Sequence, residues 1–272
     1  MIVRLPFLAA ALCVGAMSFQ ATPAHSADNE IPSAFGSVSN PGSALIGIFY
    51  DLKQTQKREA VDPKFLETYH SFIGSGWDEN VLSRFFRATR PVYTTQIYVP
   101  YMGAGAAPRA FSLQDVVRPT QWLVIYKGQV SPPEDGTYRF VGVADDIMAV
   151  AVNGKTVLVS NFGSGEESPT WKPPEPKSAI PGGPFTMQRG DWFNARKGEP
   201  IDLEVLIGEF PGNLFGAWLM IEKQGVDYPV KDDPNYGKRA VLPLFQVAPQ
   251  TVDSSTQPVP FSSDGPVWTC HQ

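Results

Sequence analysis

Short stretches of alternating apolar and polar residues, separated by turn-forming residues, dominate the second half of the chain. The clearest is 201–207, in which the odd-numbered positions are apolar while Asp202 and Glu204 are charged. This alternation is typical of an antiparallel strand with one buried face. Further strands are expected over 44–50, 94–99, 122–126, 137–144, 148–152, 155–159 and 217–222, with an edge strand over 242–247. Short strands between regular turns predict a mostly β fold, an antiparallel β-sandwich.

The dipeptide Asn153-Gly154 lies between two apolar runs and is the strongest hairpin signal in the chain. A two-residue turn sets the register of the strands that flank it. We therefore expect Val150 to lie opposite Val157, and Met148 opposite Val159, on one apolar face.

Helical spacing of apolar residues appears only between about 52 and 110. Asp62 followed by Pro63 is a typical helix start, with Asp as the N-cap and Pro at the first helical position. Asp78 is a candidate cap for a second helix that would carry Leu82 and Phe86 on its apolar stripe. This stretch is predicted to be a small helical insertion after the first strand.

The two ends of the chain differ from the sandwich segment, 44–225. A short basic lead, an apolar run over 5–19 and small residues at 24–26 predict a signal peptide over 1–26, and hence a secreted or periplasmic protein. The apolar run is too short to span a membrane. Residues 27–43 are expected to form a disordered linker, and 226–272 a partly disordered C-terminal extension. Cys270, the one cysteine left after signal cleavage, is expected to be an exposed free thiol.

Composition narrows the possible functions. The net charge of −5 offers no basic surface for nucleic acid. The chain has no phosphate loop, dinucleotide fingerprint, zinc-ligand spacing or G-x-S-x-G elbow. His70 is the only histidine between the signal segment and the tail. We therefore predict that the protein is not an enzyme.

Asp145-Asp146, at the end of an expected strand, is the strongest candidate for binding chemistry. Neighbouring strand residues point to opposite faces, so two such side chains can hold one ion only across an unusual peptide such as a cis bond. Calcium suits such a site because it accepts six to eight oxygen ligands in flexible geometry. The alternative is an ordinary polar turn in which the carboxylates accept backbone N–H groups.

The order of several short motifs resembles the protective-antigen fourteen-kilodalton-type (PA-fourteen) domain family over residues 44–225. The motifs are Ala44-Leu-Ile-Gly-Ile-Phe-Tyr50, Gly136-Thr-Tyr-Arg-Phe140, Asp145-Asp146, Val152-Asn-Gly-Lys155, Gly190-Asp-Trp192, Glu204-Val-Leu-Ile-Gly-Glu209 and Gly216-Ala-Trp-Leu219. The resemblance implies a secreted and mostly non-catalytic β-sandwich. In the adhesin branch, two successive aspartates joined by a cis peptide bind calcium, which holds sugar hydroxyls. Other branches lack this site and serve as structural or assembly domains.

The loop 208–216 should supply the third metal ligand. Asn213 is the best match to the family's asparagine, and Glu209 is the alternative, although this loop departs from the adhesin pattern by its Phe-Pro-Gly segment. Phe210 and Phe215 are candidates either for an apolar surface beneath a sugar ring or for packing within the loop. Trp171, on a loop rich in Pro and Gly, is expected to be an exposed ligand-binding aromatic. Trp192 and Trp218 are expected in the core.

Two functions follow from these patterns. The first is a secreted, non-catalytic module that binds a glycan, with calcium held by Asp145, Asp146 and Asn213. The second is a structural or assembly protein of an extracellular or periplasmic complex. In that case the exposed loops and the segment from Val226 onward would contact a protein partner.

Overall fold

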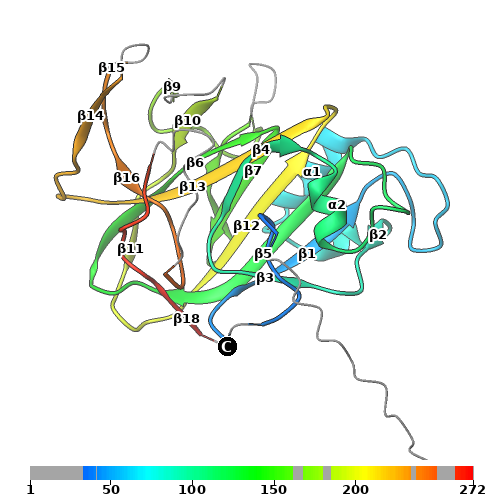
Figure 1. Cartoon of the computed structure of the whole chain (residues 1–272), viewed down its shortest axis with the longest axis horizontal. Coiled ribbons are helices and arrows are strands. Elements are labelled where there is room, and N and C mark those ends of the chain that lie inside the picture. The colour runs from blue at the N-terminus through cyan, green and yellow to red at the C-terminus, as the bar shows by residue number, and fades with distance from the viewer. Residues whose placement is uncertain are drawn as a thin grey trace, which may run out of the picture. The chain divides into compact units, whose positions relative to one another are not determined.

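The computed structural model describes residues 33–40, 42–161, 168–179, 185–233, 237–249 and 261–271 (Figure 1). Residues 31–272 form one folded unit, and antiparallel strands are the main secondary structure of its described part. The predicted signal peptide over 1–26 lies outside the described residues. No helix in the described part is both long enough and apolar enough to cross a membrane.

The first sheet has eight strands in the order β2-β1-β5-β12-β7-β8, with β3 also paired to β1 and β18 to β5. The strands are β1 (Leu45–Asp51), β2 (Phe86–Arg87), β3 (Val92–Thr94), β5 (Trp122–Ser131), β7 (Ile147–Val152), β8 (Lys155–Val159), β12 (Ile201–Glu209) and β18 (Thr269–His271). Each pair of neighbours is antiparallel. This sheet accounts for most of the strands predicted from the alternating pattern.

The second sheet has six strands in the order β4-β13-β6-β10-β9, with β11 also paired to β6. The strands are β4 (Tyr98–Gly103), β6 (Gly136–Asp145), β9 (Ser178–Ala179), β10 (Thr186–Arg189), β11 (Phe193–Ala195) and β13 (Leu214–Lys223). Two further pairs lie outside both sheets: β14 (Val230–Asp233) with β15 (Gly237–Ala240), and β16 (Leu242–Pro243) with β17 (Phe261–Ser262). The predicted mostly β, antiparallel fold is confirmed.

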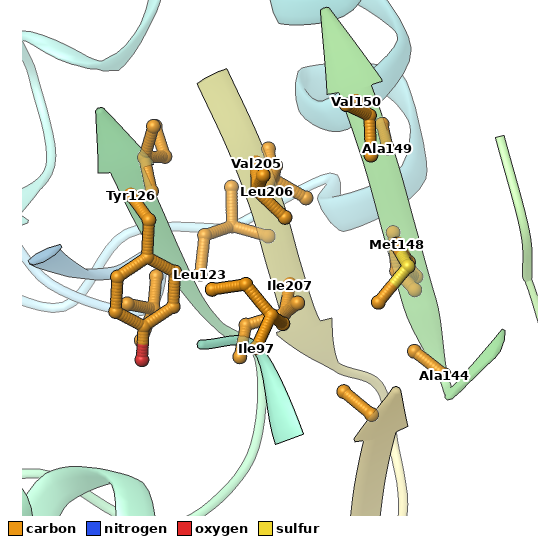
Figure 2. Packing of buried hydrophobic residues seen from close by; sticks show 14 of the residues in the cluster. Ile97, Leu123, Tyr126, Ala144, Met148, Ala149, Val150, Val205, Leu206 and Ile207 are labelled. Carbon is orange, nitrogen blue, oxygen red and sulfur yellow. The ribbon is translucent and has the colours of Figure 1, made fainter. Parts of the chain in front are cut away.

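Apolar side chains from both sheets form the main core. Figure 2 shows side chains of β5, β12 and β7 side by side, with Ala144 of the second sheet near Met148. The rings of Trp122 on β5 and Phe215 on β13 lie 4.9 Å apart between centroids. The sheets approach closely at Gly142 on β6, where an added Cβ would lie 2.5 Å from the sulfur of Met148. A side chain there would have to displace Met148.

The helices are short and confined to the predicted insertion: α1 (Phe65–Gly74), the 3₁₀ turn η1 (Glu79–Leu82) and α2 (Ala106–Ala110). α1 begins two residues after Pro63 because Lys64 is in the left-handed region, and Asp62 accepts a hydrogen bond from the Lys64 N–H instead of capping the helix. Asp78 does cap a turn, by accepting from the Asn80 N–H. The expected second helix is wrong beyond that turn, because Phe86 belongs to β2.

The insertion is more than helical. Its segment 86–103 contributes β2 and β3 to the first sheet and β4 to the second. The prediction that 52–110 stands outside the sandwich is therefore wrong, although the small helices themselves are confirmed. Long-range pairing of β4 with β13 decides the conformation of this segment, and local helical spacing does not reveal it.

The Asn153-Gly154 hairpin forms as predicted, but its register differs. Val152 pairs with Lys155 and Ala151 with Thr156, and then an irregularity shifts Val150 to Leu158. The expected pairing of Val150 with Val157 is wrong because a β-bulge places Val157 as the extra residue. The carbonyl of Val157 accepts a hydrogen bond of 2.7 Å from the Asp191 N–H, outside the hairpin.

The segment before β1 is ordered where it is described, 33–40. Phe35 is only 1% exposed, and its ring lies 5.8 Å from that of Trp122. Its carbonyl accepts a 2.8 Å hydrogen bond from the hydroxyl of Tyr126. The expectation of a disordered linker is wrong over this part, because one buried aromatic anchors an otherwise small and polar segment.

The C-terminal extension is likewise built into the sandwich over 261–271. Trp268 is fully buried, with its ring 5.1 Å from Tyr138 and 5.7 Å from Phe245. Cys270 lies on β18, is partly buried, and its thiol contacts the carbonyl of Ala44 at 3.3 Å. The prediction of an exposed thiol on a loose tail is therefore wrong for these residues, while 250–260 lie outside the described part.

Candidate functional site

Asp145 and Asp146 lie where the chain crosses from one sheet to the other. Asp145 is the last residue of β6 in the second sheet, and β7 of the first sheet begins at Ile147. The Asp145–Asp146 peptide is cis. The Asp146 N–H donates to the Gly208 carbonyl at 3.3 Å, and the Asp146 carboxylate accepts from the Phe210 N–H. The pair is thus fixed to the end of β12.

The two carboxyl groups converge. Asp145 and Asp146 are joined by a side-chain hydrogen bond, and Asp145 also accepts one from the hydroxyl of Tyr101. Asp145 is only 8% exposed. Burial raises the pKa of Asp145, and the two hydrogen bonds only partly offset that rise. Asp146 does accept a backbone N–H, as in the polar-turn alternative, whereas Asp145 lies beside the Tyr101 hydroxyl.

Glu209, the last residue of β12, is a third acidic group beside the pair. It is fully buried, and neither of its carboxylate oxygens has a hydrogen-bond partner among the described residues. Burial, followed by the charges of Asp146 and Asp145, raises the pKa of Glu209 to about 9. An added Cβ on Gly212 would lie 3.2 Å from one Glu209 oxygen, so the loop after β12 covers this carboxyl group.

Tyr101 on β4 is a site residue that the sequence did not reveal. Its ring is 38% exposed, and its hydroxyl donates to Asp145. Burial of the hydroxyl and the charges of Asp145, Glu209 and Asp146 raise the pKa of Tyr101, which places the phenol beside all three acids. No local signal could have found it, because its position depends on β4 pairing with β13 across more than a hundred residues.

Asn213 lies in the turn between β12 and β13, four positions after Glu209, and is exposed. Its backbone carbonyl accepts a 2.9 Å hydrogen bond from the Ala104 N–H, which fixes the turn against the segment after β4. The structure therefore places Asn213 in the same loop as Glu209. Its role as a metal ligand stays a prediction.

The predicted aromatic surface is not at the predicted residues. Phe215 is fully buried between Phe35 and Trp122, so it cannot face a sugar. Phe210 is partly buried and stacks on Phe65 with ring centroids 4.9 Å apart. Packing within the fold, the alternative considered for both residues, describes them correctly.

The predicted exposure of the tryptophans is also partly wrong. Trp171 is only 8% exposed, and its indole N–H donates to Asp191 at 3.2 Å, so the expectation of an exposed ligand-binding aromatic loses its basis. Trp192, expected in the core, is 37% exposed and lies over the guanidinium of Arg139. Trp218 is buried as predicted.

The acidic side chains alone do not supply enough ligands for a metal ion at this site. Within the described ranges, no group of three or more His, Cys, Asp or Glu side chains is arranged to hold a metal ion. A cation at Asp145 and Asp146 would need further oxygens from backbone carbonyls, from the Asn213 amide, from water or from a ligand.

Solved structures with similar folds are distant from this chain. The PA14 domain of the antifreeze protein MpAFP is 14% identical, with a TM-score of 0.40, over 69% of this chain and 87% of that one. The Epithelial Adhesin 6 A domain from Candida glabrata, solved with Galβ1-3GlcNAc, is 14% identical with a TM-score of 0.44, over 76% of this chain and 91% of that one. A PA14 sugar-binding domain from an RTX adhesin is 16% identical with a TM-score of 0.34, over 69% of this chain and 93% of that one.

A comparison with curated protein sequences finds no match. The family model of the PA14 domain matches residues 114–182, a segment that runs from before β5 to beyond β8 and includes Asp145 and Asp146. The resemblance to the PA14 domain family is therefore confirmed, through this segment of the sandwich.

Proposed function

We propose that this protein is an exported, non-catalytic module that binds a carbohydrate through a calcium ion at the end of β6. Asp145 and Asp146 would hold the ion, with Asn213 or Glu209 as the third protein ligand. Two sugar hydroxyls would complete the coordination. The PA14 domain match over these strands and the sugar complexes of the similar adhesin domains agree with this proposal.

The observation that carries the proposal is the environment of Glu209. A fully buried carboxyl group without a hydrogen-bond partner is costly in a folded protein. Here two further acids lie beside it, and their charges raise its pKa still more. A divalent cation held by Asp145 and Asp146 would lessen the repulsion that the Glu209 carboxyl group meets from them.

The residues present fit calcium better than magnesium. Calcium accepts carboxylate, amide, carbonyl, water and hydroxyl oxygens together, whereas magnesium demands near-ideal octahedral geometry and keeps its waters. When bound, calcium would supply a positive centre for vicinal hydroxyls of a sugar. The chain itself fixes the two carboxylates, through the Phe210 N–H on Asp146 and the Tyr101 hydroxyl on Asp145. An affinity of about 10⁻⁴–10⁻³ M suffices for an extracellular calcium module.

The test compares Asp146→Asn with the wild-type protein by thermal melting in calcium and in chelator, and by binding to a glycan panel. Calcium at 100 times its Kd should stabilise the wild-type protein by about 2.7 kcal/mol, and this gain should vanish in the variant together with glycan binding. Asp202→Asn is the charge-matched control. Asp202 is exposed near the start of β12, and its carboxylate accepts a hydrogen bond from the Gln129 amide. Equal melting of the wild-type protein in calcium and chelator, without glycan binding, would refute the proposal.

An assembly role is the second candidate, and the β14–β15 pair favours it. These strands belong to neither main sheet, and Val230 on β14 is 64% exposed. Each strand of a two-stranded ribbon has an outer edge that can pair with a strand of another chain. If this role is correct, a second exported protein should co-purify with the wild-type chain and be lost from Val230→Lys, while Asp146→Asn retains it.

A further inference from the structure

Tyr101 presents an exposed aromatic ring beside the acidic pair. The ring packs edge-on against Phe185, with centroids 5.2 Å apart, and Phe185 in turn packs edge-on against Trp218 at 5.4 Å. Phe185 and Trp218 are both buried. The Tyr101 ring therefore packs on buried aromatic neighbours, and Tyr101 as a whole remains 38% exposed.

Gly216 on β13 lies between Tyr101 and Asp145. It pairs with Asp145 on β6, and an added Cβ there would lie 3.3 Å from the Tyr101 ring and 3.4 Å from the Tyr101 Cα. The strand pairing between β13 and β4 is also irregular at this point. Because Gly216 has no side chain, the Tyr101 ring lies directly against β13 and its hydroxyl reaches Asp145.

Leu214 extends the same surface. It pairs with Gly103, which lies two residues after Tyr101 and so faces the same side of the sheet. Gly103 has no side chain, and nothing lies within 4 Å of the place a Cβ would occupy. Leu214 is 46% exposed. Two exposed apolar side chains thus flank an open position immediately next to the acidic pair.

We propose that Tyr101 and Leu214 form the apolar half of the ligand site and select pyranose sugars that carry a continuous C–H face beside a vicinal diol. The diol would lie toward Asp145 and Asp146, and the C–H face would pack on the Tyr101 ring. This inference rests on the proposed carbohydrate function and adds the class of sugar to it. Open-chain polyols, which have the diol but no rigid apolar face, would gain little from this surface.

The hydroxyl and the ring of Tyr101 have separate tasks. The hydroxyl of Tyr101 donates a hydrogen bond to Asp145. That contact orients a carboxylate that the cation needs. The ring offers apolar area to the ligand and makes no contribution to the cation. Replacing the ring and replacing only the hydroxyl should therefore have different consequences.

The experiment measures binding of methyl pyranosides and of an open-chain polyol by calorimetry in calcium, and calcium-dependent melting in parallel. Tyr101→Ala should weaken pyranoside binding about tenfold or more, a change of about 1.4 kcal/mol, which aromatic packing can supply. Polyol binding should change little. Tyr101→Phe should keep most pyranoside affinity, and Leu214→Glu, at an exposed position, should weaken it. Trp192→Ala removes an equally exposed aromatic remote from the pair and should leave binding unchanged.

The possible outcomes distinguish a failure of this inference from a failure of the proposed carbohydrate-binding function. If the wild-type protein binds pyranosides and Tyr101→Ala and Leu214→Glu bind them equally well, the apolar surface is wrong and the calcium-dependent module stands. If Tyr101→Phe loses as much pyranoside affinity as Tyr101→Ala, the contact of the hydroxyl with Asp145 accounts for the loss and the sugar-packing role of the ring is wrong. If the wild-type protein binds no sugar, both proposals fall. Melting of each variant in chelator shows whether it folds.

Discussion

Acidic side chains occupy two kinds of environment in this protein. Several glutamates are paired with cationic groups, whereas Glu209, at the end of β12, has no hydrogen-bond partner among the described residues. Glu79 and Glu204 both contact the Lys127 ammonium, at 2.6 and 2.7 Å, and Glu79 also accepts a 2.5 Å hydrogen bond from Tyr50. Burial alone would raise the pKa of Glu79, but the hydrogen bonds from Lys127 and Tyr50 outweigh it and lower the pKa.

A second paired group lies on β6, β10 and β13. The guanidinium of Arg139 contacts Glu222 at 2.7 Å and Glu175 at 2.6 Å, and Arg189 lies 3.7 Å from each of these acids. The hydrogen bond from Arg139 lowers the pKa of Glu175. Arg139 is at the opposite end of β6 from Asp145, so one strand carries both environments.

This difference distinguishes acidic groups that stabilise the fold from acidic groups that are candidates for function. The paired glutamates named above each have a lysine or arginine within hydrogen-bond distance. At the end of β12, Glu209 has no hydrogen-bond partner among the described residues, while Asp146 accepts from the Phe210 N–H and Asp145 lies beside the Tyr101 phenol. Sites that violate local rules of stability are where function is expected.

The largest effect should come from removing a cation from the paired region. Arg139→Met leaves Glu222 and Glu175 without their nearest partner, and the Arg139 side chain is only 7% exposed. We expect unfolding to become easier by about 3 kcal/mol, the scale of breaking a buried pair from one side. Urea unfolding at pH 7 measures the change.

Arg196→Met is the matched control for that variant. Arg196 and Glu199 form a 3.4 Å pair in which both side chains are mostly exposed. Exposed pairs contribute little, so the control should change the free energy of unfolding by less than about 0.5 kcal/mol. Equal effects of the two substitutions would contradict the view that the Arg139 group is structurally required.

Removing the Glu209 carboxyl group should change the free energy of unfolding in the opposite direction. Glu209 has a raised pKa, so folding binds a proton there that the unfolded chain releases more readily. In chelator, stability should fall as the pH rises from about 4.5 toward 9. Glu209→Gln should remove much of that slope and stabilise the metal-free protein by about 1–3 kcal/mol at pH 8, a range below the full value of the shift.

Glu204→Gln on the same strand is the control for Glu209→Gln, because Glu204 is paired with Lys127. It should destabilise the protein slightly and leave the pH dependence between 5 and 9 unchanged. Calcium should reduce or reverse the advantage of Glu209→Gln if it binds beside this residue. A metal-free Glu209→Gln protein that is less stable than wild type at pH 8 would show that the Glu209 carboxyl group is satisfied in the fold.

The sequence pattern was informative where neighbours along the chain decide the structure. Alternation over 201–207 and the Asn153-Gly154 turn led to the correct strands, and the helices fell inside the expected insertion. Segments that depend on distant partners were misjudged. Phe35 and Trp268 are single apolar residues in polar segments, yet they fill core positions between strands that pattern alone does not bring together.

The candidate site shows the same division. Asp145-Asp146 was visible as a motif, and Glu209 was considered only as an alternative ligand because nothing local indicates its complete burial. That burial comes from the turn around Gly212, which covers the carboxyl group. The exposure of Trp171 and Trp192 was predicted in reverse, because the local pattern shows neither of their contacts: Trp171 donates to Asp191, between β10 and β11, and Trp192 lies over Arg139 of β6.

The smallest expected effect concerns Glu79, at the exposed margin of the paired region. Because its pKa is lowered in the fold, Glu79 should stabilise the protein above about pH 4.5, and this contribution should disappear as the pH falls through its folded-state pKa. Its side chain is 37% exposed, so solvent screening limits the contribution to less than about 1 kcal/mol. Glu79→Gln should therefore lower stability slightly at pH 7 and not at pH 3. Glu67→Gln, in an exposed pair with Lys64, should change neither. A stability gain for Glu79→Gln at pH 7, like that expected for Glu209→Gln, would mean that pairing with Lys127 does not distinguish the two environments.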